Sequence, residues 1–193
     1  MMETIRCDEK GLVRAAAVLN AGGVAVIPTD TVYGLAAHPA FPDSVDRLYT
    51  IKGREAKKPI ALLAADLESI EAFGYPLPKN AAELATRYWP GALTLVIENP
   101  TATQTEGFRI PNHDWTRHLL KMCGGVLRVT SANLSGQRPA TDAPQALADV
   151  GLAADLVVDD GVSPGGTAST VIRVAASGGL SILRPGPITL DAL

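Results

Sequence analysis

The sequence predicts an α/β protein built on a mixed sheet. Short apolar runs between turn residues alternate with segments of helical periodicity along most of the chain. The apolar runs 170–174 and 180–183 follow each other without a helical segment between them, so the sheet is not expected to be wholly parallel. With 193 residues, 47% of them apolar, the chain is expected to form one globular domain over residues 1–193.

Each predicted element depends on a local pattern. Helices are predicted where apolar residues recur at three- and four-residue spacing, and Asp66 and Asn80 are suited to cap two of them. These helices span residues 11–20, 43–51, 66–73, 80–88, 114–123 and 142–150. Strands are predicted where short apolar runs are bounded by breakers such as Pro59. These strands span residues 24–28, 60–65, 92–98, 108–111, 126–130, 156–158, 170–174 and 180–183.

The composition excludes several classes of protein. The formal net charge of −3 gives no overall preference for nucleic acid or an anionic membrane, although a local basic cleft is compatible with it. No apolar run reaches transmembrane length and no secretory leader is visible, so a cytoplasmic location without membrane contact is expected. Cys7 and Cys123 lack CxxC spacing and are expected to be free thiols. His38, His113 and His118 form no HExxH or Cys/His grouping, so no protein-built metal site is expected.

Two predicted strands end in clusters of polar side chains. Residues 28–34 read PTDTVYG and bring hydroxyls, a carboxylate and a phenol to the end of a buried strand. Residues 128–136 read RVTSANLSG and supply further hydroxyls and an amide. Ligand crevices of α/β sheets lie at such strand ends, while the alternative is a pair of ordinary turns. Two such ends in one small domain favour a ligand site.

Cationic side chains near chain breakers suggest an anionic ligand. Lys52 and Arg54 leave a predicted helix on either side of a glycine, where they would suit either a phosphate or the helix C-terminus. Arg109 lies in an otherwise apolar strand and needs a partner if buried, either a ligand carboxylate or an acidic residue of the protein. Arg184 ends the last strand. Neither GxxxxGK[ST] nor GxGxxG occurs, so any nucleotide must be bound by another arrangement.

These segments, taken together, resemble the YrdC-like family. The resemblance covers nearly the whole chain, and the order of the segments is far more specific than any one of them. The segments are PTDTVYG (28–34), KGR (52–54), WPG (89–91), RIP (109–111), SAN (131–133), ST (169–170) and LRPG (183–186). The resemblance implies a twisted mixed sheet with flanking helices around a deep positive cavity.

The activity that the resemblance implies is synthesis of L-threonylcarbamoyladenylate from L-threonine, bicarbonate and ATP, with release of pyrophosphate. The product would feed a tRNA threonylcarbamoyl transferase complex, and Mg²⁺ bound through the ATP phosphates is the expected cofactor. The family's signature residues match Lys52, Arg54, Ser131 and Asn133, which we take as catalytic. Threonine would be bound by Thr31, Arg109, Ser131 and Ser169. ATP would be bound by Arg54, Lys58, Thr105, Asn133, Thr141 and Arg184, with Tyr33 in the cavity wall.

The chain departs from the family pattern at three places. Leu63 stands where some relatives carry histidine, and Ala168 replaces the acidic or proline residue common before the Ser-Thr pair. Longer relatives have a further C-terminal domain, so here the site is expected to be closed by loops of this domain or by partners.

Two other functions fit the same fold. One is a non-catalytic module that contacts structured RNA, which the net charge of −3 and the aromatic share of 5% disfavour. The other is a carbamoyl-phosphate-handling domain like that of hydrogenase maturation proteins, whose zinc-finger segments are missing here.

Overall fold

The computed structural model describes residues 3–55, 58–99, 104–175 and 177–189. Its strands are β1 (Glu3–Arg6), β2 (Val24–Ile27), β3 (Gly34–Ala37), β4 (Leu62–Ala64), β5 (Leu93–Glu98), β6 (Thr105–Arg109), β7 (Val126–Ser131), β8 (Leu156–Asp159), β9 (Thr170–Val174) and β10 (Leu180–Arg184). Its helices are α1 (Glu9–Asn20), α2 (Pro42–Lys52), α3 (Leu67–Ala72), α4 (Lys79–Tyr88), α5 (Asp114–Met122) and α6 (Ala143–Asp149), with a 3-10 turn at Gly151–Ala153.

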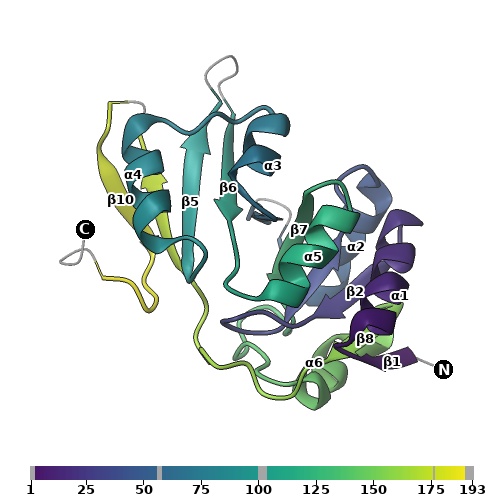
Figure 1. The fold of residues 1–193 in the computed structure, drawn as a ribbon. Helices are drawn as coiled ribbons and strands as arrows, with labels where there is room; N and C mark the ends of the chain where they lie inside the picture. Colours follow the sequence, from purple (N-terminus) through teal and green to yellow (C-terminus); the bar gives the residue numbers. More distant parts are fainter. Residues whose placement is uncertain (1–2, 56–57, 100–103, 176, 190–193) are drawn as a thin grey trace.

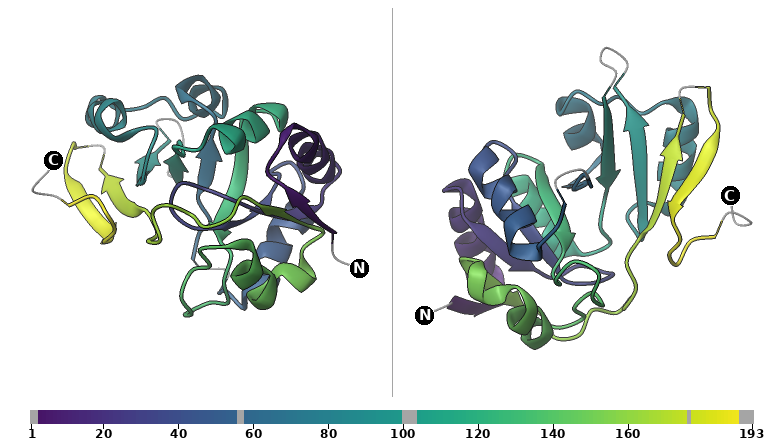
Figure 2. Two further views of the ribbon diagram at one scale, coloured as in Figure 1. Left: turned by 60° about the horizontal axis from the view of Figure 1, so that its bottom comes forward. Right: turned by 180° about the vertical axis from the view of Figure 1, so that it is seen from behind.

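The described strands form one mixed sheet in the order β1-β8-β2-β3-β7-β4-β6-β5-β9-β10. The pairs β1–β8, β2–β8, β4–β6 and β5–β9 are parallel, and the other neighbours are antiparallel. Strands near β2 and strands near β5 run in clearly different directions, so the sheet is twisted (Figures 1 and 2). The prediction of an α/β fold with a mixed sheet is therefore confirmed.

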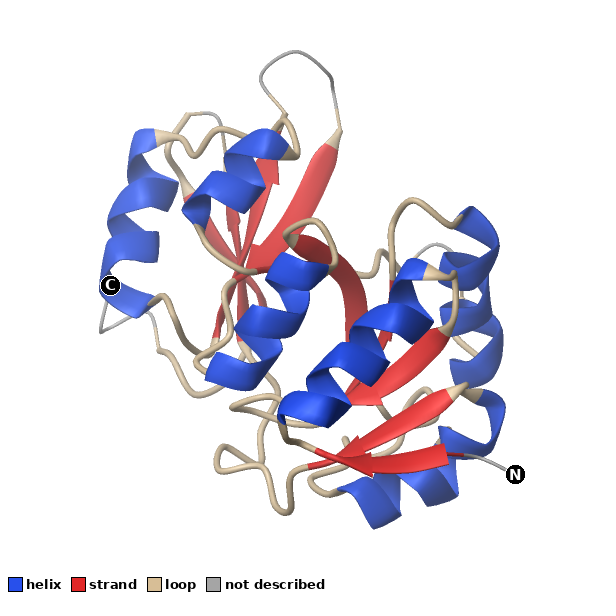
Figure 3. Cartoon of the chain, turned by 45° about the vertical axis from the view of Figure 1, so that its right-hand side comes forward, coloured by secondary structure: helices blue, strands red, loops and turns tan. Residues whose placement is uncertain are grey.

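Around β2 the sheet is buried on both faces. Ala25 and Ile27 pack in the cluster that contains the apolar side chains of α1 and α5. Val24 and Val26 point the other way, into the cluster that contains those of α2 and α6. Successive side chains of a strand face opposite sides, so a strand covered on both sides must be apolar throughout. Figure 3 shows these helices packed outside the strands.

The part of the sheet formed by β5, β6 and β9 is covered differently. Leu93, Leu95 and Phe108 pack with α3 and α4 in a third apolar cluster. The alternate residues of the same strands, such as Thr94 and Val96, face a cavity instead. The polar residues within these strands therefore follow the same period of two as the apolar ones.

Most predicted elements occur within a few residues of their expected bounds, with three exceptions. β1 was not predicted because its residues are largely exposed and polar, as suits an edge strand. β3 was not predicted because its four residues, three of them Gly or Ala, directly follow the polar segment that reads as a turn. The strand predicted at 108–111 is β6, which begins earlier because its polar start pairs with Glu98 of β5. Within the described residues, no helix has the length and apolarity needed to cross a membrane.

Helix α1 provides a test of the packing between helix and sheet. Leu19 is fully buried, whereas Val13 on the same helix is 58% exposed. We expect Leu19→Ala to lower the free energy of unfolding by about 2–5 kcal/mol, because it leaves a cavity. Val13→Ala should change it by less than about 0.5 kcal/mol. Urea denaturation measures both, and equal effects of the two substitutions would contradict the assigned orientation of α1.

Candidate active site

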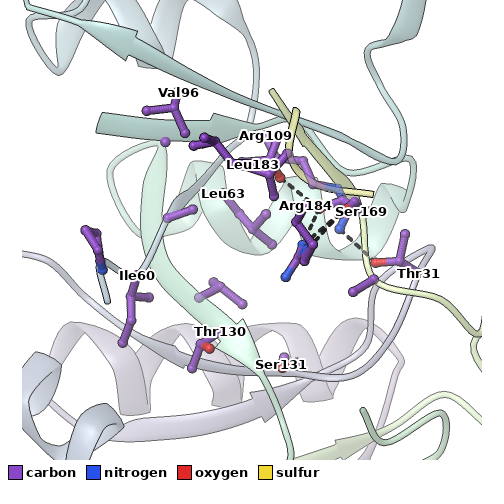
Figure 4. A pocket seen from close by; sticks show the side chains of 18 of the residues that line it. Thr31, Ile60, Leu63, Val96, Arg109, Thr130, Ser131, Ser169, Leu183 and Arg184 are labelled. Atoms are coloured by element: carbon purple, nitrogen blue, oxygen red, sulfur yellow. Dashed lines mark hydrogen bonds between the residues drawn. The ribbon is translucent and has the colours of Figure 1, made fainter. Parts of the chain in front are cut away.

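A cavity of about 440 Å³ lies on the face of β5, β6 and β9 that is turned away from α3 and α4. Residues of β3, β7 and the β2–β3 loop form its opposite wall. Thr31, Arg109, Ser169 and Arg184 gather at one end of it, and Ile60 lies toward the other end (Figure 4). This size, with hydroxyls and cations gathered at one end, is typical of a small-molecule site.

Most of the residues predicted from the sequence meet in this cavity. Those that line it are Thr31, Tyr33, Arg54, Thr105, Arg109, Ser131, Ser169 and Arg184. Leu63 and Ala168, the two departures from the family pattern, also line it. Lys52, Lys58, Asn133 and Thr141 do not belong to the described lining.

The β2–β3 loop is positioned by its own hydroxyls and by Arg109. The Thr29 hydroxyl donates to the Val32 carbonyl at 2.6 Å and accepts from the Thr31 amide at 3.1 Å, which fixes the turn. Gly165 packs so closely that a Cβ there would lie 2.6 Å from the Asp30 carbonyl oxygen. The loop thus holds Thr31 against the cavity.

Arg109 is bound mainly by protein groups. Its Nε donates to the Gly91 carbonyl at 2.9 Å, one Nη donates to the Thr31 hydroxyl at 2.7 Å, and the other donates to Asp30. The side chain is nearly fully buried, and burial lowers the pKa of Arg109 while the Asp30 carboxylate raises it. Of the two partners considered from the sequence, the acidic residue is therefore present. Asp30 lies inside the predicted polar segment but was not among the predicted ligands.

Ser169 lies between Thr94 and Arg184. Its hydroxyl is 2.8 Å from the Thr94 hydroxyl, and Arg184 donates to both the carbonyl and the hydroxyl of Ser169. Gly186 permits this close approach, since a Cβ there would lie 2.4 Å from the backbone nitrogen of Thr170. Thr94 was missed as a site residue. Thr94 is a polar residue between two apolar strand residues, Leu93 and Leu95, and this alternation places it on the opposite face of the strand, so the pattern could have identified it.

Two cations that line the cavity, Arg54 and Arg184, have no acidic partner among the described residues. Burial lowers the pKa of Arg184, and the like charge of Arg54 lowers it further. Arg54 donates to the carbonyls of Lys58 and Pro59, and Arg184 donates to Ser169. In the described part of the chain, neither guanidinium forms an ion pair. Two such groups beside a cavity favour an anionic ligand between or beside them.

The other charged residues of the described wall, Glu106 and Arg173, are paired with Arg128 and Glu98. Arg128 binds Glu106 through two hydrogen bonds of 2.7 and 2.6 Å and also donates to the Ile60 carbonyl. Glu106 and Arg173 both line the cavity, and neither was predicted as a site residue. The depth and positive charge of the cavity stay predictions.

Lys52 lies beneath the cavity rather than in its wall. It is 2% exposed, and its Nζ donates to the carbonyls of Ser131 and Asn133. Asn133 in turn donates to the carbonyls of Leu134 and Gln137, at 2.8 and 2.9 Å. Lys52 thus fixes the segment that carries Ser131.

The remaining predicted residues have other partners. The Thr141 hydroxyl contacts Gln145 at 3.3 Å. Lys58 is exposed and lies 3.8 Å from Glu55. Tyr33 is buried, its hydroxyl donates to the Gly161 carbonyl at 2.7 Å, and burial raises its pKa to about 12. Tyr33 therefore stays protonated as a wall residue.

The chain matches proteins of known family. Residues 17–186 match the Sua5/YciO/YrdC family, described as "Telomere recombination". A Mycobacterium tuberculosis protein, provisionally named as a threonylcarbamoyl-AMP synthase, is 34% identical, and the match covers 100% of this chain and 94% of that one. The threonylcarbamoyl-AMP synthase of Bacillus subtilis is 33% identical, with 99% of this chain and 58% of that protein covered.

Solved structures agree with the fold. The crystal structure of P. abyssi Sua5 complexed with L-threonine has a TM-score of 0.89 and 30% identity, covering 99% of this chain and 59% of that chain. E. coli YciO has a TM-score of 0.86 at 21% identity, covering 100% of this chain and 98% of that chain. At this level of identity, the similarity supports only the fold. The twisted mixed sheet therefore has counterparts over the whole chain.

Lys52 gives a titration test of this arrangement. Burial, and then the nearby charge of Arg54, lower the pKa of Lys52 from 10.5 to about 8. The unfolded chain therefore binds more protons at this site between about pH 8 and 10.5. The destabilising cost of burying the charge is full below about pH 8 and disappears as pH rises toward 10.5. We expect the NMR signal that Lys52→Met removes to titrate near pH 8.

The same linkage predicts that the wild type gains stability relative to Lys52→Met as pH rises from 8 to 10. Urea denaturation of both proteins at several pH values measures the difference. A Lys52 signal that titrates at the ordinary lysine value, with no pH-dependent difference in stability, would refute the burial of a charged amine there.

Proposed function

The chain belongs to the Sua5/YciO/YrdC family, and from this premise we propose that it is an L-threonylcarbamoyladenylate synthase. It would condense L-threonine, bicarbonate and ATP into threonylcarbamoyl-AMP and pyrophosphate. The observation that carries the proposal is the pair Arg54 and Arg184, which face the cavity without carboxylate partners in the described residues. Hydroxyls that could orient an amino acid lie in the same cavity.

The proposed reaction needs positioning more than it needs a protein nucleophile. The threonine amine would add to the carbon of bicarbonate with loss of water, giving a carbamate. A carbamate oxygen would then attack the α-phosphorus of ATP, and the bond to the β-phosphate oxygen would break to release pyrophosphate. Both reactants are anions, so cations that screen their repulsion and hold them in line lower the barrier.

In this proposal threonine occupies the polar end of the cavity. Thr31, Ser131 and Ser169 would contact its polar groups. Arg109 would bind its carboxylate, because the three hydrogen bonds described above leave one N–H free on each terminal nitrogen. Asp30 would keep Arg109 in place rather than touch the substrate.

ATP would lie beside the threonine. Arg54, Arg184 and Thr105 line the cavity and would contact the nucleotide. Lys58, Asn133 and Thr141 lie outside the lining, so the nucleotide would have to extend beyond the cavity to reach them. Lys52 would act by holding the Ser131 segment.

Mg²⁺ would enter the site bound to the ATP phosphates. Among the described residues of this region, the Asp30 and Glu106 carboxylates are already paired with Arg109 and Arg128, so the phosphates are the expected ligands of the ion. When bound, the ion would neutralise phosphate charge. The product would pass to a threonylcarbamoyl transferase acting on tRNA, and a cytoplasmic location would suit that partner.

The first test is pyrophosphate release. We expect release only when L-threonine, bicarbonate and ATP are all present, and we expect threonylcarbamoyl-AMP in the mixture by mass spectrometry. Valine should lower kcat/KM on the order of 10²-fold or more, because hydroxyls buried around the missing group lose their partner. Serine, which lacks only a methyl group, should lower it by about tenfold.

Two results would contradict the proposal. Equal turnover with valine and threonine would contradict the assignment of threonine to the polar end of the cavity. Structured RNA bound in a salt-dependent way, with no pyrophosphate released, would favour the non-catalytic alternative.

Arg184 offers a test of the nucleotide side. Arg184→Lys keeps the charge but loses the planar fork, so KM for ATP should rise by about tenfold or more. KM for threonine should rise less, through loosening of Ser169. Arg14→Lys is the matched control, since Arg14 is exposed and paired with Glu3. Normal ATP kinetics combined with a lower Tm would show that Arg184 only supports Ser169.

A further inference from the structure

Three side chains of types that can bind a metal ion meet outside the cavity lining, where β1, the end of β8 and the start of α5 come together. Cys7 follows β1, Asp160 follows β8, and His113 caps α5. Their thiol, carboxylate and imidazole ligand atoms all lie within 4.8 Å of one another. We propose that this Cys7–His113–Asp160 cluster binds a zinc ion, with water as the fourth ligand. No sequence motif marks this cluster, because its members are far apart in the chain, and the proposal departs from the expectation of no protein-built metal site.

The spacing of the cluster suits a small tetrahedral ion. Zinc bonds of about 2.0–2.3 Å place tetrahedral ligand atoms about 3.3–3.6 Å apart. His113 Nε2 and Asp160 Oδ2 are now 2.9 Å apart, so they need to separate only slightly. Cys7 is half-buried, whereas the Asp160 side chain is 42% exposed. The open side at Asp160 gives the ion an entry path and room for a water ligand.

The chemistry of the three ligands selects zinc among common divalent ions. A thiolate and a carboxylate together cancel a charge of +2, and a neutral imidazole adds no charge. Sulfur and nitrogen ligands suit zinc, whereas magnesium and calcium prefer oxygen alone. In the described part of the chain, Asp160 forms an ion pair with His113 alone, so no lysine or arginine competes with the metal.

The histidine is held by a neighbour that can set its tautomer. His113 Nδ1 accepts a hydrogen bond from the Thr116 amide at 3.3 Å, which caps α5, and it lies 3.0 Å from the Thr116 hydroxyl. That hydroxyl donates its own proton to the Pro28 carbonyl at 2.8 Å, so its oxygen can accept a proton from Nδ1. With Nδ1 accepting from the amide, Nε2 carries the proton that faces Asp160 Oδ2. Zinc binding would move this proton to Nδ1, where the Thr116 hydroxyl would accept it in place of the amide contact, and Nε2 would then offer a lone pair to the metal, as metal-bound histidines usually do.

The backbone around the ligands is anchored on each side. The Cys7 amide donates to the Asp159 carbonyl at 2.9 Å, which ties β1 to β8. The Asp160 amide donates to the Tyr33 hydroxyl at 3.0 Å. Trp115, next to the first residue of α5, donates to the Asp8 carbonyl at 2.9 Å. Ligands fixed in this way lose little freedom when they bind an ion, and the site does not depend on the proposed activity.

The test uses the full chain, stripped with a chelator and then titrated with zinc chloride by calorimetry. We expect one zinc ion per chain and a higher Tm when zinc is added. Cobalt chloride serves as a spectroscopic probe on the unmutated protein. Tetrahedral cobalt bound by Cys7 should show strong visible bands and a thiolate-to-cobalt charge-transfer band in the near ultraviolet.

Matched variants assign the ligands. Cys7→Ser should remove the charge-transfer band and weaken zinc binding on the order of tenfold or more. His113→Asn should weaken it similarly while keeping a side-chain oxygen to cap α5. Cys123→Ala and His118→Asn, outside the cluster, should leave zinc affinity unchanged. Absence of zinc binding, a cobalt spectrum without the thiolate band, or unchanged affinity in both cluster variants would overturn the proposal.

Discussion

The contact between Arg109 and Asp30 organises the molecule around its cavity. Arg109 ends β6, whereas Asp30 and Thr31 belong to the loop between β2 and β3, and strands β7 and β4 lie between β3 and β6 in the sheet. A buried guanidinium is tolerated only when its charge and its N–H groups are satisfied. That requirement draws the loop, the Gly91 turn and β6 to one point. The polar end of the cavity exists because these three segments meet there.

The position of the cavity follows from how helices cover the sheet. Around β2, helices cover both faces and every strand residue must be apolar. Around β5, the helices α3 and α4 cover only one face, so the strand residues on the other face are free to be polar. Thr94, Arg109 and Arg173 occupy that face. The same period of two that builds the core therefore also builds the site.

The sequence was informative where chemistry and local pattern coincide. Thr31 follows a predicted strand, Arg109 interrupts an apolar one and Ser169 was named from the family resemblance, and the structure places the three together. Lys52 could not be distinguished from Arg54, because burial depends on tertiary packing and not on the local pattern. Asp160 was not predicted as a metal ligand for the same reason, since Cys7 and His113 come from distant parts of the chain. Strand β3 was missed because its pairing with β2 and β7, rather than its composition, makes it a strand.

The exposed strand β10 has a consequence for how the site responds to its ligand. All of its residues have exposed surface, although the Arg184 guanidinium reaches the cavity and is partly desolvated, and the strand pairs with a single neighbour at the edge of the sheet. Such a strand can open at a lower free energy than the core, without unfolding the rest of the domain. Since β10 carries Arg184, each opening would remove a cation from the cavity. An anion bound there would favour the closed strand. Ligand binding in the cavity and the closing of β10 are therefore thermodynamically coupled.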